Sequence, residues 1–251
     1  SRRKHINIMC VCYVRSTICC TCSKPMKTND KQMWMPDEET WHRWGSSYEK
    51  DKFQKCMEYT EDKPMRVALD IGAHIGIWTR RLSNLYEEVI CFEPTPDHIE
   101  CHKKNCQTIN NIKLHEIALG SKEEKLEMKI IHGRGGNNSF HFGKDGKNRK
   151  FIHEKKMIEL QSLDSFNIDN VDFIKIDVEN HELEMLKGAV KTLEKCNPTI
   201  FIEDMIYFDN KKNNRTTPSL YGDSLTGVDF LCSLGYNNVE YLGSYNYLVT
   251  R

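Results

Sequence analysis

Residues 67–79 read VALDIGAHIGIWT, and this stretch decides the fold. An apolar run ends at Asp70, and Gly72 and Gly76 flank a turn that leads into a helical segment. A strand, a glycine turn and a helix in this order are typical of a doubly wound α/β sheet. The spacing is D-x-G-x-x-x-G, which differs from the G-x-G-x-x-G of a dinucleotide fold. Glycines at this turn let a ligand approach the backbone closely, because a Cβ there would collide with it.

Short apolar runs alternate with helical segments along the rest of the chain. The predicted strands are Arg66–Ile71, Glu88–Phe92, Ile112–Ala118, Val171–Val178, Thr199–Glu203, Val239–Leu242 and Tyr245–Thr250. The predicted helices are Trp78–Tyr86, Pro96–Asn105, His181–Leu193 and Leu225–Leu234. This alternation predicts a mostly parallel sheet covered by helices. Only Gly243 and Ser244 separate the last two strands, which indicates a hairpin and a final antiparallel strand. We therefore expect the α/β class I methyltransferase fold, a Rossmann-like seven-stranded sheet with helices on both faces.

The charge of the chain is balanced in total but uneven along its length. Lys and Arg together number 36, as do Asp and Glu, among 251 residues. This balance argues against a uniformly basic nucleic-acid binder. No apolar run of about 18 residues is present, so we expect no membrane span. Residues 1–29 hold six basic residues and no acid, and residues 132–156 hold seven basic and two acidic residues.

Three strand ends together predict a nucleoside pocket. Glu93 follows Asp70 by 23 residues and ends the second strand, where a carboxylate can accept hydrogen bonds from both ribose hydroxyls. The alternative is a carboxylate that caps the helix after Pro94. Ala118, within the sequence IALGS, ends the third predicted strand, where an adenine ring could lie against small residues.

Six motifs occur in chain order: DIGAHIG, FEPTPD, IALGS, LDSF, FIKIDVENHELEMLKGA and PTIFIE. They resemble the FkbM-type family of S-adenosylmethionine-dependent O-methyltransferases over roughly residues 64–205. The resemblance implies S-adenosylmethionine as cofactor, S-adenosylhomocysteine as product, and a hydroxyl-bearing acceptor that is often a sugar or glycan. It places Asp177 and Glu179 at the edge of the active site. The predicted cofactor-binding residues are Asp70, Gly72, Ala73, His74, Gly76, Thr79, Glu93, Pro94, Ala118, Ser139 and Asp177.

The chain departs from this family pattern at two places. Asn180 and His181 stand where the family usually has a Gly-Ala pair after D-V-E, and His74 stands where it often has Asn. Both departures bear on which acceptor is methylated more than on which cofactor is bound.

Methyl transfer to a sugar hydroxyl needs a base, because the hydroxyl is a poor nucleophile. Asp177 ends a buried strand beside the predicted cofactor site, so it is either that base or a group that orients the cofactor's amino group. His181 is a second candidate base. The alternative interpretation is that His181 has a structural role or lies at the edge of the substrate site. Glu203 is a third, and with Asp204 and Asp177 it could instead hold a divalent cation, although we expect no required metal.

Residues 132–156 form a basic, Gly- and Asn-rich insertion. We interpret it as a lid from which Asn138 and Ser139 could reach cofactor or acceptor; the alternative is a solvated insertion. The basic loop also leaves open an RNA methyltransferase, less favoured than a carbohydrate enzyme. A non-catalytic module that keeps the cofactor pocket is the other alternative.

The domain organisation is predicted in three parts. Residues 1–29 are a basic, Cys-rich leader in which Met26 could be the natural start. Residues 30–63 are a helical lead-in, and residues 64–251 are the methyltransferase domain. In the lead-in, Trp41, Trp44 and Tyr48 have helical spacing and would pack onto the main domain; the alternative is a platform for the substrate.

Cysteine usage adds a prediction about the compartment. Five of the 11 cysteines, at positions 10, 12, 19, 20 and 22, cluster in the leader and could bind zinc, although their spacing is not that of a zinc ribbon. The scattered remainder predicts a reducing compartment, and hence the cytoplasm.

Overall fold

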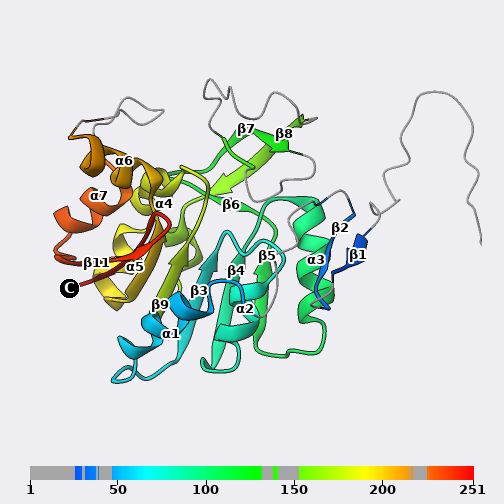
Figure 1. Ribbon diagram of the computed structural model, residues 1–251, viewed down its shortest axis with the longest axis horizontal. Helices are drawn as coiled ribbons and strands as arrows, with labels where there is room; N and C mark the ends of the chain where they lie inside the picture. The colour runs from blue at the N-terminus through cyan, green and yellow to red at the C-terminus, as the bar shows by residue number, and fades with distance from the viewer. Residues whose placement is uncertain are drawn as a thin grey trace, which may run out of the picture.

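A seven-stranded sheet forms the centre of the protein (Figure 1). The computed structural model describes residues 26–29, 32–37, 39, 47–131, 138–140, 153–214, 216 and 225–251. In spatial order the strands of the sheet are β11 (Asn238–Gly243), β12 (Asn246–Thr250), β10 (Thr199–Glu203), β9 (Val171–Ile176), β3 (Val67–Ile71), β4 (Glu88–Phe92) and β5 (Ile112–His115). β12 runs antiparallel to both of its neighbours, and the other pairings are parallel. The predicted fold class is therefore confirmed.

The central strands are buried on both faces. Every residue of β3 and of β9 is buried, which accounts for their mostly apolar sequences, although the two strands also bury Asp70, Asp172 and Lys175. Successive side chains of a strand point to opposite faces. Leu69 of β3 accordingly belongs to one apolar cluster and Ala68 to another, and Ile174 and Phe173 of β9 divide in the same way.

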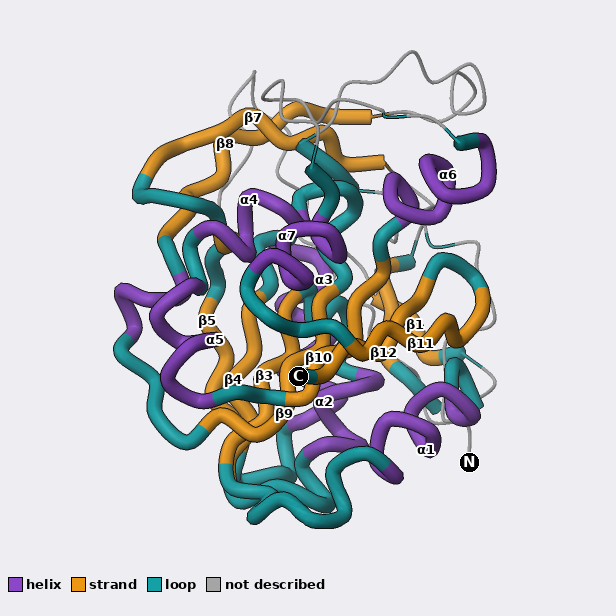
Figure 2. The backbone as a smooth tube through the Cα atoms, turned by 90° about the vertical axis from the view of Figure 1, so that its left-hand side faces the viewer, coloured by secondary structure: helices purple, strands orange, loops and turns teal. Residues whose placement is uncertain are grey.

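Helices cover both faces of this sheet (Figure 2). On one side α4 (Glu182–Lys187), α5 (Val190–Cys196) and α7 (Gly227–Ser233) pack on the larger apolar cluster. On the other side α1 (Lys50–Glu58) and α2 (Ile77–Leu82) pack on the second cluster. There Trp78 of α2 stacks on Phe201 of β10, with ring centroids 4.6 Å apart. The remaining helices are α3 (Pro96–Cys106), α6 (Met205–Asn213) and the short 3₁₀ helix η2 (Leu163–Phe166).

The predicted helix over residues 181–193 is divided in the structure. α4 ends before Gly188, and α5 begins two residues after it. A Cβ on Gly188 would lie 2.0 Å from the carbonyl oxygen of Gly120, so only glycine allows this close approach. The break in the helix therefore follows from a contact between distant segments.

A second, three-stranded sheet lies above the main one in Figure 1. It contains β6 (Ala118–Leu119), β8 (His153–Gln161) and β7 (Glu124–Ile131), with β8 in the middle. The prediction of one strand over residues 112–118 was wrong, because β5 ends at His115 and Ala118 pairs with Leu160 of β8. The prediction of a loop through residue 156 was wrong at its C-terminal end, because β8 begins at His153.

The part of the chain before β3 contains strand as well as helix. β1 (Met26–Thr28) pairs antiparallel with β2 (Trp34–Pro36), and α1 covers part of the predicted helical lead-in. The Asn105 side chain of α3 anchors β2, because it accepts from the Trp34 N–H at 2.8 Å and donates to the Trp34 carbonyl at 2.9 Å. The predictions for the cysteine cluster, for Trp41 and Trp44 and for most of the basic loop lie outside the described residues. Within those residues, no helix has the length and apolar character needed to cross a bilayer.

Candidate active site

A cavity of about 450 Å³ opens at the carboxyl ends of β3, β4, β9 and β10. The chain leaves β3 toward β4 on one side and returns to β9 on the other, so this is the point where the strand order reverses. Open α/β sheets bind their ligands at such a point. Nine predicted site residues line the cavity: Gly72, Ala73, His74, Glu93, Pro94, Ala118, Asp177, His181 and Glu203.

The turn after β3 forms part of the cavity wall. Gly72 has φ +77°, and a Cβ there would lie 1.8 Å from the carbonyl oxygen of Asp177. The N–H groups of Gly72 and Ala73 both donate to the Phe92 carbonyl, at 3.0 and 3.1 Å, which ties the turn to β4. Gly76 does not line the cavity; its φ is +89°, and a Cβ there would lie 3.0 Å from the His102 ring. Gly72 therefore shapes the cavity, whereas Gly76 allows α3 to pack closely.

Glu93 is a buried carboxylate that the protein holds in its ionised form. It accepts from the backbone N–H groups of His74 at 2.8 Å and Thr95 at 2.9 Å, and lies 3.4 Å from Nδ1 of His98. Burial raises the pKa of Glu93, but the hydrogen bond and charge of His98, with smaller contributions from His74 and Thr95, bring the pKa to about 2. An anion that accepts hydrogen bonds thus faces the cavity, as the predicted ribose site requires. The carboxylate also binds the N-cap residue of α3, so the two sequence interpretations are compatible.

Two predicted cofactor residues lie beneath the cavity wall. Asp70 is fully buried and accepts from Oγ1 of Thr79 at 2.6 Å. That hydroxyl oxygen is also 3.0 Å from Nε2 of His102. Neither Asp70 nor Thr79 lines the cavity; the two side chains bind each other behind its wall.

Lys175 is a buried cation that sequence reasoning missed. Its ammonium donates to the Gly72 carbonyl at 2.6 Å and lies 3.5 Å from a carboxylate oxygen of Asp70 and of Asp177. Burial lowers the pKa of Lys175, but the charges of Asp177 and Asp70 outweigh it and leave the pKa above its usual value. One signal was available, since Lys175 lies two residues before Asp177; its pairing in register with Asp70 is seen only in the structure.

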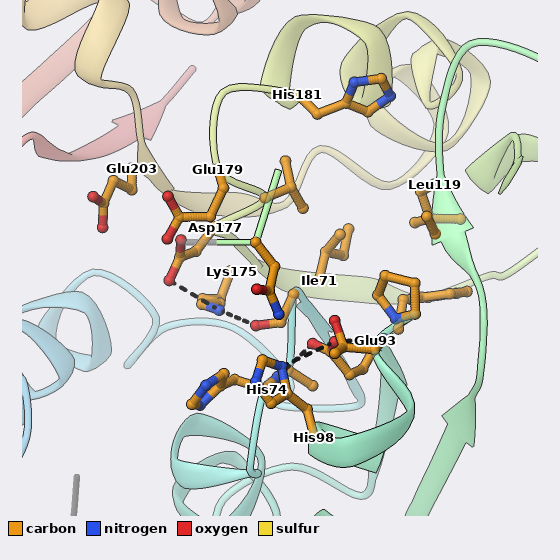
Figure 3. Close-up of a pocket in the computed structure, with 18 of the residues that line it drawn as sticks. Ile71, His74, Glu93, His98, Leu119, Lys175, Asp177, Glu179, His181 and Glu203 are labelled. Carbon is orange, nitrogen blue, oxygen red and sulfur yellow. Dashed lines mark hydrogen bonds and ion pairs between the residues drawn. The ribbon is translucent and has the colours of Figure 1, made fainter. Parts of the chain in front are cut away.

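Three carboxyl groups gather at the other end of the cavity. Figure 3 shows Glu179 and Glu203 beside Asp177, away from Glu93. Burial raises the pKa of Asp177, with Lys175 opposing it. Burial and the charge of Asp177 raise the pKa of Glu203 to about 8, and they raise the pKa of Glu179 well above its usual value. Because these carboxyl groups raise one another's pKa, the proton taken up by one depends on the charge of the others.

His181, the other candidate base, is set apart from these carboxyls in Figure 3. It is buried at the start of α4, and its ring centroid lies 4.8 Å from that of Phe140. It lines the cavity on the side of the small sheet rather than beside the acids.

Asp204 has a structural role, because both of its carboxylate oxygens bind backbone groups. One accepts from the N–H of Tyr207 at 2.8 Å, and the other from the N–H of Val228 at 2.9 Å. In the described part of the chain, no group of three or more His, Cys, Asp or Glu side chains is arranged to hold a metal ion. The cation alternative over Asp177, Glu203 and Asp204 therefore has no support.

Residues 138–140 of the basic insertion lie against the cavity. Ser139 forms two backbone hydrogen bonds with Lys129 of β7, at 2.9 and 3.1 Å, and its hydroxyl donates to the Glu179 carbonyl at 2.7 Å. Asn138 and Phe140 line the cavity, whereas Ser139 does not. The cavity is also lined by Tyr48, which the sequence offered as a packing residue or part of a substrate platform, and by Met205, Ser244 and Tyr245, which it did not single out.

The strand order and the glycine turn beside the cavity define a class I methyltransferase fold. A family model described as "Methyltransferase FkbM domain" matches residues 70–237, well over half of the chain. The chain belongs to this family, and the resemblance seen in its motifs is confirmed.

Comparison with known proteins gives relatives of low identity. "Methyltransferase 1" of Beauveria bassiana is 22% identical over 156 residues, which are 53% of this chain and 62% of that protein. "2-O-methyltransferase NoeI" of Sinorhizobium fredii is 24% identical over 149 residues, or 53% of this chain and 61% of that protein. The matches thus span about three-fifths of these relatives. A solved FkbM methyltransferase from Methylobacillus flagellatus KT is 16% identical, with a TM-score of 0.47, covering 74% of this chain and 43% of that one.

Proposed function

We propose that this protein transfers a methyl group from S-adenosylmethionine to a hydroxyl group of a carbohydrate. One observation carries the proposal: an ionised Glu93 and the positive-φ turn at Gly72 lie together in the cavity where the strand order reverses. Membership of the FkbM methyltransferase domain family supports it.

The cavity fits a nucleoside cofactor in size and in chemistry. A volume of about 450 Å³ lies within the range of small-molecule sites. Glu93 would accept hydrogen bonds from the ribose hydroxyls, and the apolar surfaces of Pro94, Ala118 and Leu119 would pack against the adenine ring. When bound, S-adenosylmethionine supplies an electrophilic methyl group on its sulfonium. The turn at Gly72 would leave room for the rest of the cofactor beside Asp177.

The carboxyl groups at the other end supply the base that a hydroxyl acceptor needs. Asp177 is held by Lys175 at the cavity wall, and Glu203 has a pKa of about 8, close to the value at which a group exchanges protons at neutral pH. We assign proton removal to this coupled pair, with Asp177 as the base nearer the cofactor site. His181, buried against Phe140 and apart from the acids, is less suited to the role.

The rim beside the acids has the amphipathic surface that sugar-binding sites use. Met205 and Tyr245 line the cavity and are each 37% exposed. Phe208 packs edge-on against Tyr245, with ring centroids 5.0 Å apart. Exposed aromatic faces can stack on the C–H face of a sugar, and the nearby carboxylates can accept from its hydroxyls. The relative named 2-O-methyltransferase NoeI is consistent with a hydroxyl acceptor.

We also infer that the protein works in the reducing environment of the cytoplasm. Burial raises the pKa of the Cys101 and Cys106 thiols to about 12, which keeps them protonated and unreactive. The thiols that the structure describes are all free: Cys56, Cys91, Cys101, Cys106, Cys196 and Cys232.

Transfer of a radiolabelled methyl group to a panel of acceptors tests the function. The panel contains glycans, RNA oligomers and small hydroxy compounds, each with S-adenosylmethionine as donor. We expect label in the glycan fraction, and Asp177→Asn to reduce it by about 100-fold or more. Label in RNA alone would contradict the carbohydrate assignment, and label in no acceptor would favour a non-catalytic module.

A further inference from the structure

The side chain of Asn138, a residue that lines the cavity, carries a buried hydrogen-bond donor. Asn138 is 9% exposed and lines the cavity. Its Oδ1 accepts from the N–H of Ile131 at 2.8 Å. Because a backbone N–H needs an acceptor, this bond fixes which end of the amide faces Ile131. The amide nitrogen therefore points elsewhere, and it has no hydrogen-bond partner among the residues that the structure describes.

The segment that carries this amide is held on both sides. The backbone of Ser139 pairs with Lys129 of β7 through two hydrogen bonds. The Ser139 hydroxyl donates to the Glu179 carbonyl, which joins the segment to the turn after β9. Phe140 packs against the His181 ring. The Asn138 amide is thus positioned before any ligand arrives, which reduces the entropic cost of using it.

A buried donor without a partner is costly, and native proteins rarely keep one unless a ligand or water satisfies it. We propose that the Asn138 amide nitrogen donates a hydrogen bond to an uncharged acceptor atom of the molecule that fills the cavity. This inference rests on the proposed function and adds a binding residue to it. The atom is a ring nitrogen of the cofactor's adenine or an oxygen of the carbohydrate acceptor.

The surroundings of the amide favour a strong and selective contact. Ala118, Met128 and Phe140 line the same cavity and belong to one apolar cluster under the small sheet. A hydrogen bond in such a low-dielectric environment is stronger than one in water. Since Oδ1 is already used, Asn138 can select only for atoms that accept, and it should reject a ligand that presents a donor there.

Asn138→Asp removes the donor, and its effect is measured as ligand affinity. Aspartate keeps an oxygen that can accept from Ile131 but replaces the amide nitrogen and adds a negative charge. We expect the affinity for S-adenosylhomocysteine, measured by calorimetry, to fall by about 10-fold or more. The buried charge should also lower the melting temperature, so the affinity is measured at a temperature at which the variant is folded. If the affinity is unchanged but KM for the best glycan acceptor rises by about 10-fold or more, the partner is the acceptor. If neither changes, the inference is overturned.

Asn111→Asp is the matched control. The Asn111 amide donates to the carbonyls of Ser83 and Tyr86, at 3.0 and 2.9 Å, outside the cavity. We expect this variant also to lower the melting temperature but to leave the affinity at the wild-type value, which separates the loss of a ligand contact from a general loss of stability.

A second measurement covers the case in which Asn138→Asp fails to fold. In ¹⁵N-labelled wild-type protein, we expect the side-chain amide signals of Asn138 to shift when S-adenosylhomocysteine or a glycan acceptor is added. Unshifted signals with both saturating ligands would overturn the inference. Wild-type protein that does not bind S-adenosylhomocysteine would instead contradict the proposed function itself.

Discussion

The two ends of the cavity hold carboxyl groups whose pKa values are shifted in opposite directions. At one end, Glu93 receives two backbone N–H groups and the His98 ring, and its pKa falls to about 2. At the other end, Glu203 lies near Asp177, and burial with that negative charge raises its pKa to about 8. A carboxylate with a pKa as low as that of Glu93 can accept hydrogen bonds from a ligand but is too weak a base to remove a proton from it. A group that titrates near neutral pH suits proton transfer. This contrast supports our proposal that one end binds the cofactor and the other carries out the chemistry.

Gly72 and Lys175 connect the glycine turn to the carboxyl groups at the other end of the cavity. The Lys175 ammonium holds the Gly72 carbonyl and lies between Asp70 and Asp177. Changes at these two positions should disturb both ends at once, whereas changes at Glu93 or Glu203 should disturb only one.

The largest effect is expected from Gly72→Ala. The added Cβ would lie 1.8 Å from a backbone oxygen of Asp177, at a residue whose φ is +77°. We expect the affinity for S-adenosylhomocysteine, measured by calorimetry, to fall at least about 1000-fold, roughly 4 kcal/mol.

Gly235→Ala is the control for backbone strain alone. Gly235 has φ +90°, and a Cβ there would meet nothing within 4 Å. It should cost about 1–2 kcal/mol of stability and leave binding intact. Wild-type affinity in a folded Gly72→Ala protein would show that this turn does not shape the binding site.

Lys175→Met should have the next largest effect. Removing the cation leaves the fully buried Asp70 and the partly buried Asp177 without their partner, and breaking such a buried pair costs about 3 kcal/mol. The free energy of unfolding in urea measures this loss. The loss should be greater at pH 8 than at pH 5, because Asp177 then needs its counter-charge.

Lys195→Met is the matched surface control for that variant. Lys195 forms an ion pair with Asp169, but both side chains are more than half exposed. We expect no measurable change in stability from removing it. Equal losses in the two lysine variants would contradict the role of Lys175 as a buried link.

The smallest effects should come from Glu93→Gln and Glu203→Gln, and they should differ in sign. The pKa of Glu93 lies below its usual 4.5, so its contribution to stability is present above pH 4.5 and is lost as pH falls toward about 2. The pKa of Glu203 lies above 4.5, so the folded state binds a proton that the unfolded chain releases, and stability falls as pH rises from 4.5 to about 8.

Urea unfolding at pH 5, 7 and 9 distinguishes these signs. At pH 7, Glu93→Gln should destabilise the protein by about 1–3 kcal/mol. Glu203→Gln should stabilise it relative to wild type, and more so at pH 9 than at pH 5. If both variants shift stability in the same direction at every pH, the contrast between the two ends is wrong.

The main sheet was predictable because its signals are local. The apolar runs of β3 and β9 follow from burial on both faces, and the Gly243–Ser244 pair gave the final hairpin. The positions of Gly72 and Glu93 beside the cavity followed from their places at strand ends. These features needed no knowledge of distant contacts.

The rest of the fold depends on contacts that sequence patterns do not show. β7 and β8 were missed because charged residues interrupt them; Lys125 pairs with Glu159 and Lys155 with Glu127 across the two strands. Ala118 does not belong to the predicted third strand, because it pairs with β8 of the small sheet instead.

Parts of the site were hidden for the same reason. Lys175 is hard to recognise as a site residue until its register opposite Asp70 is known. The importance of Asn138 appears only when the Ile131 N–H is seen to use its oxygen, which leaves its nitrogen without a partner among the described residues.

Calorimetric titration of the wild-type protein with S-adenosylhomocysteine tests the central claim most directly. We expect one molecule bound per chain, with affinity that falls in Glu93→Gln and is retained in Gly235→Ala. No binding by the wild-type protein, or equal affinities of the wild-type protein and the Glu93→Gln variant, would contradict the assignment of this cavity as a cofactor site.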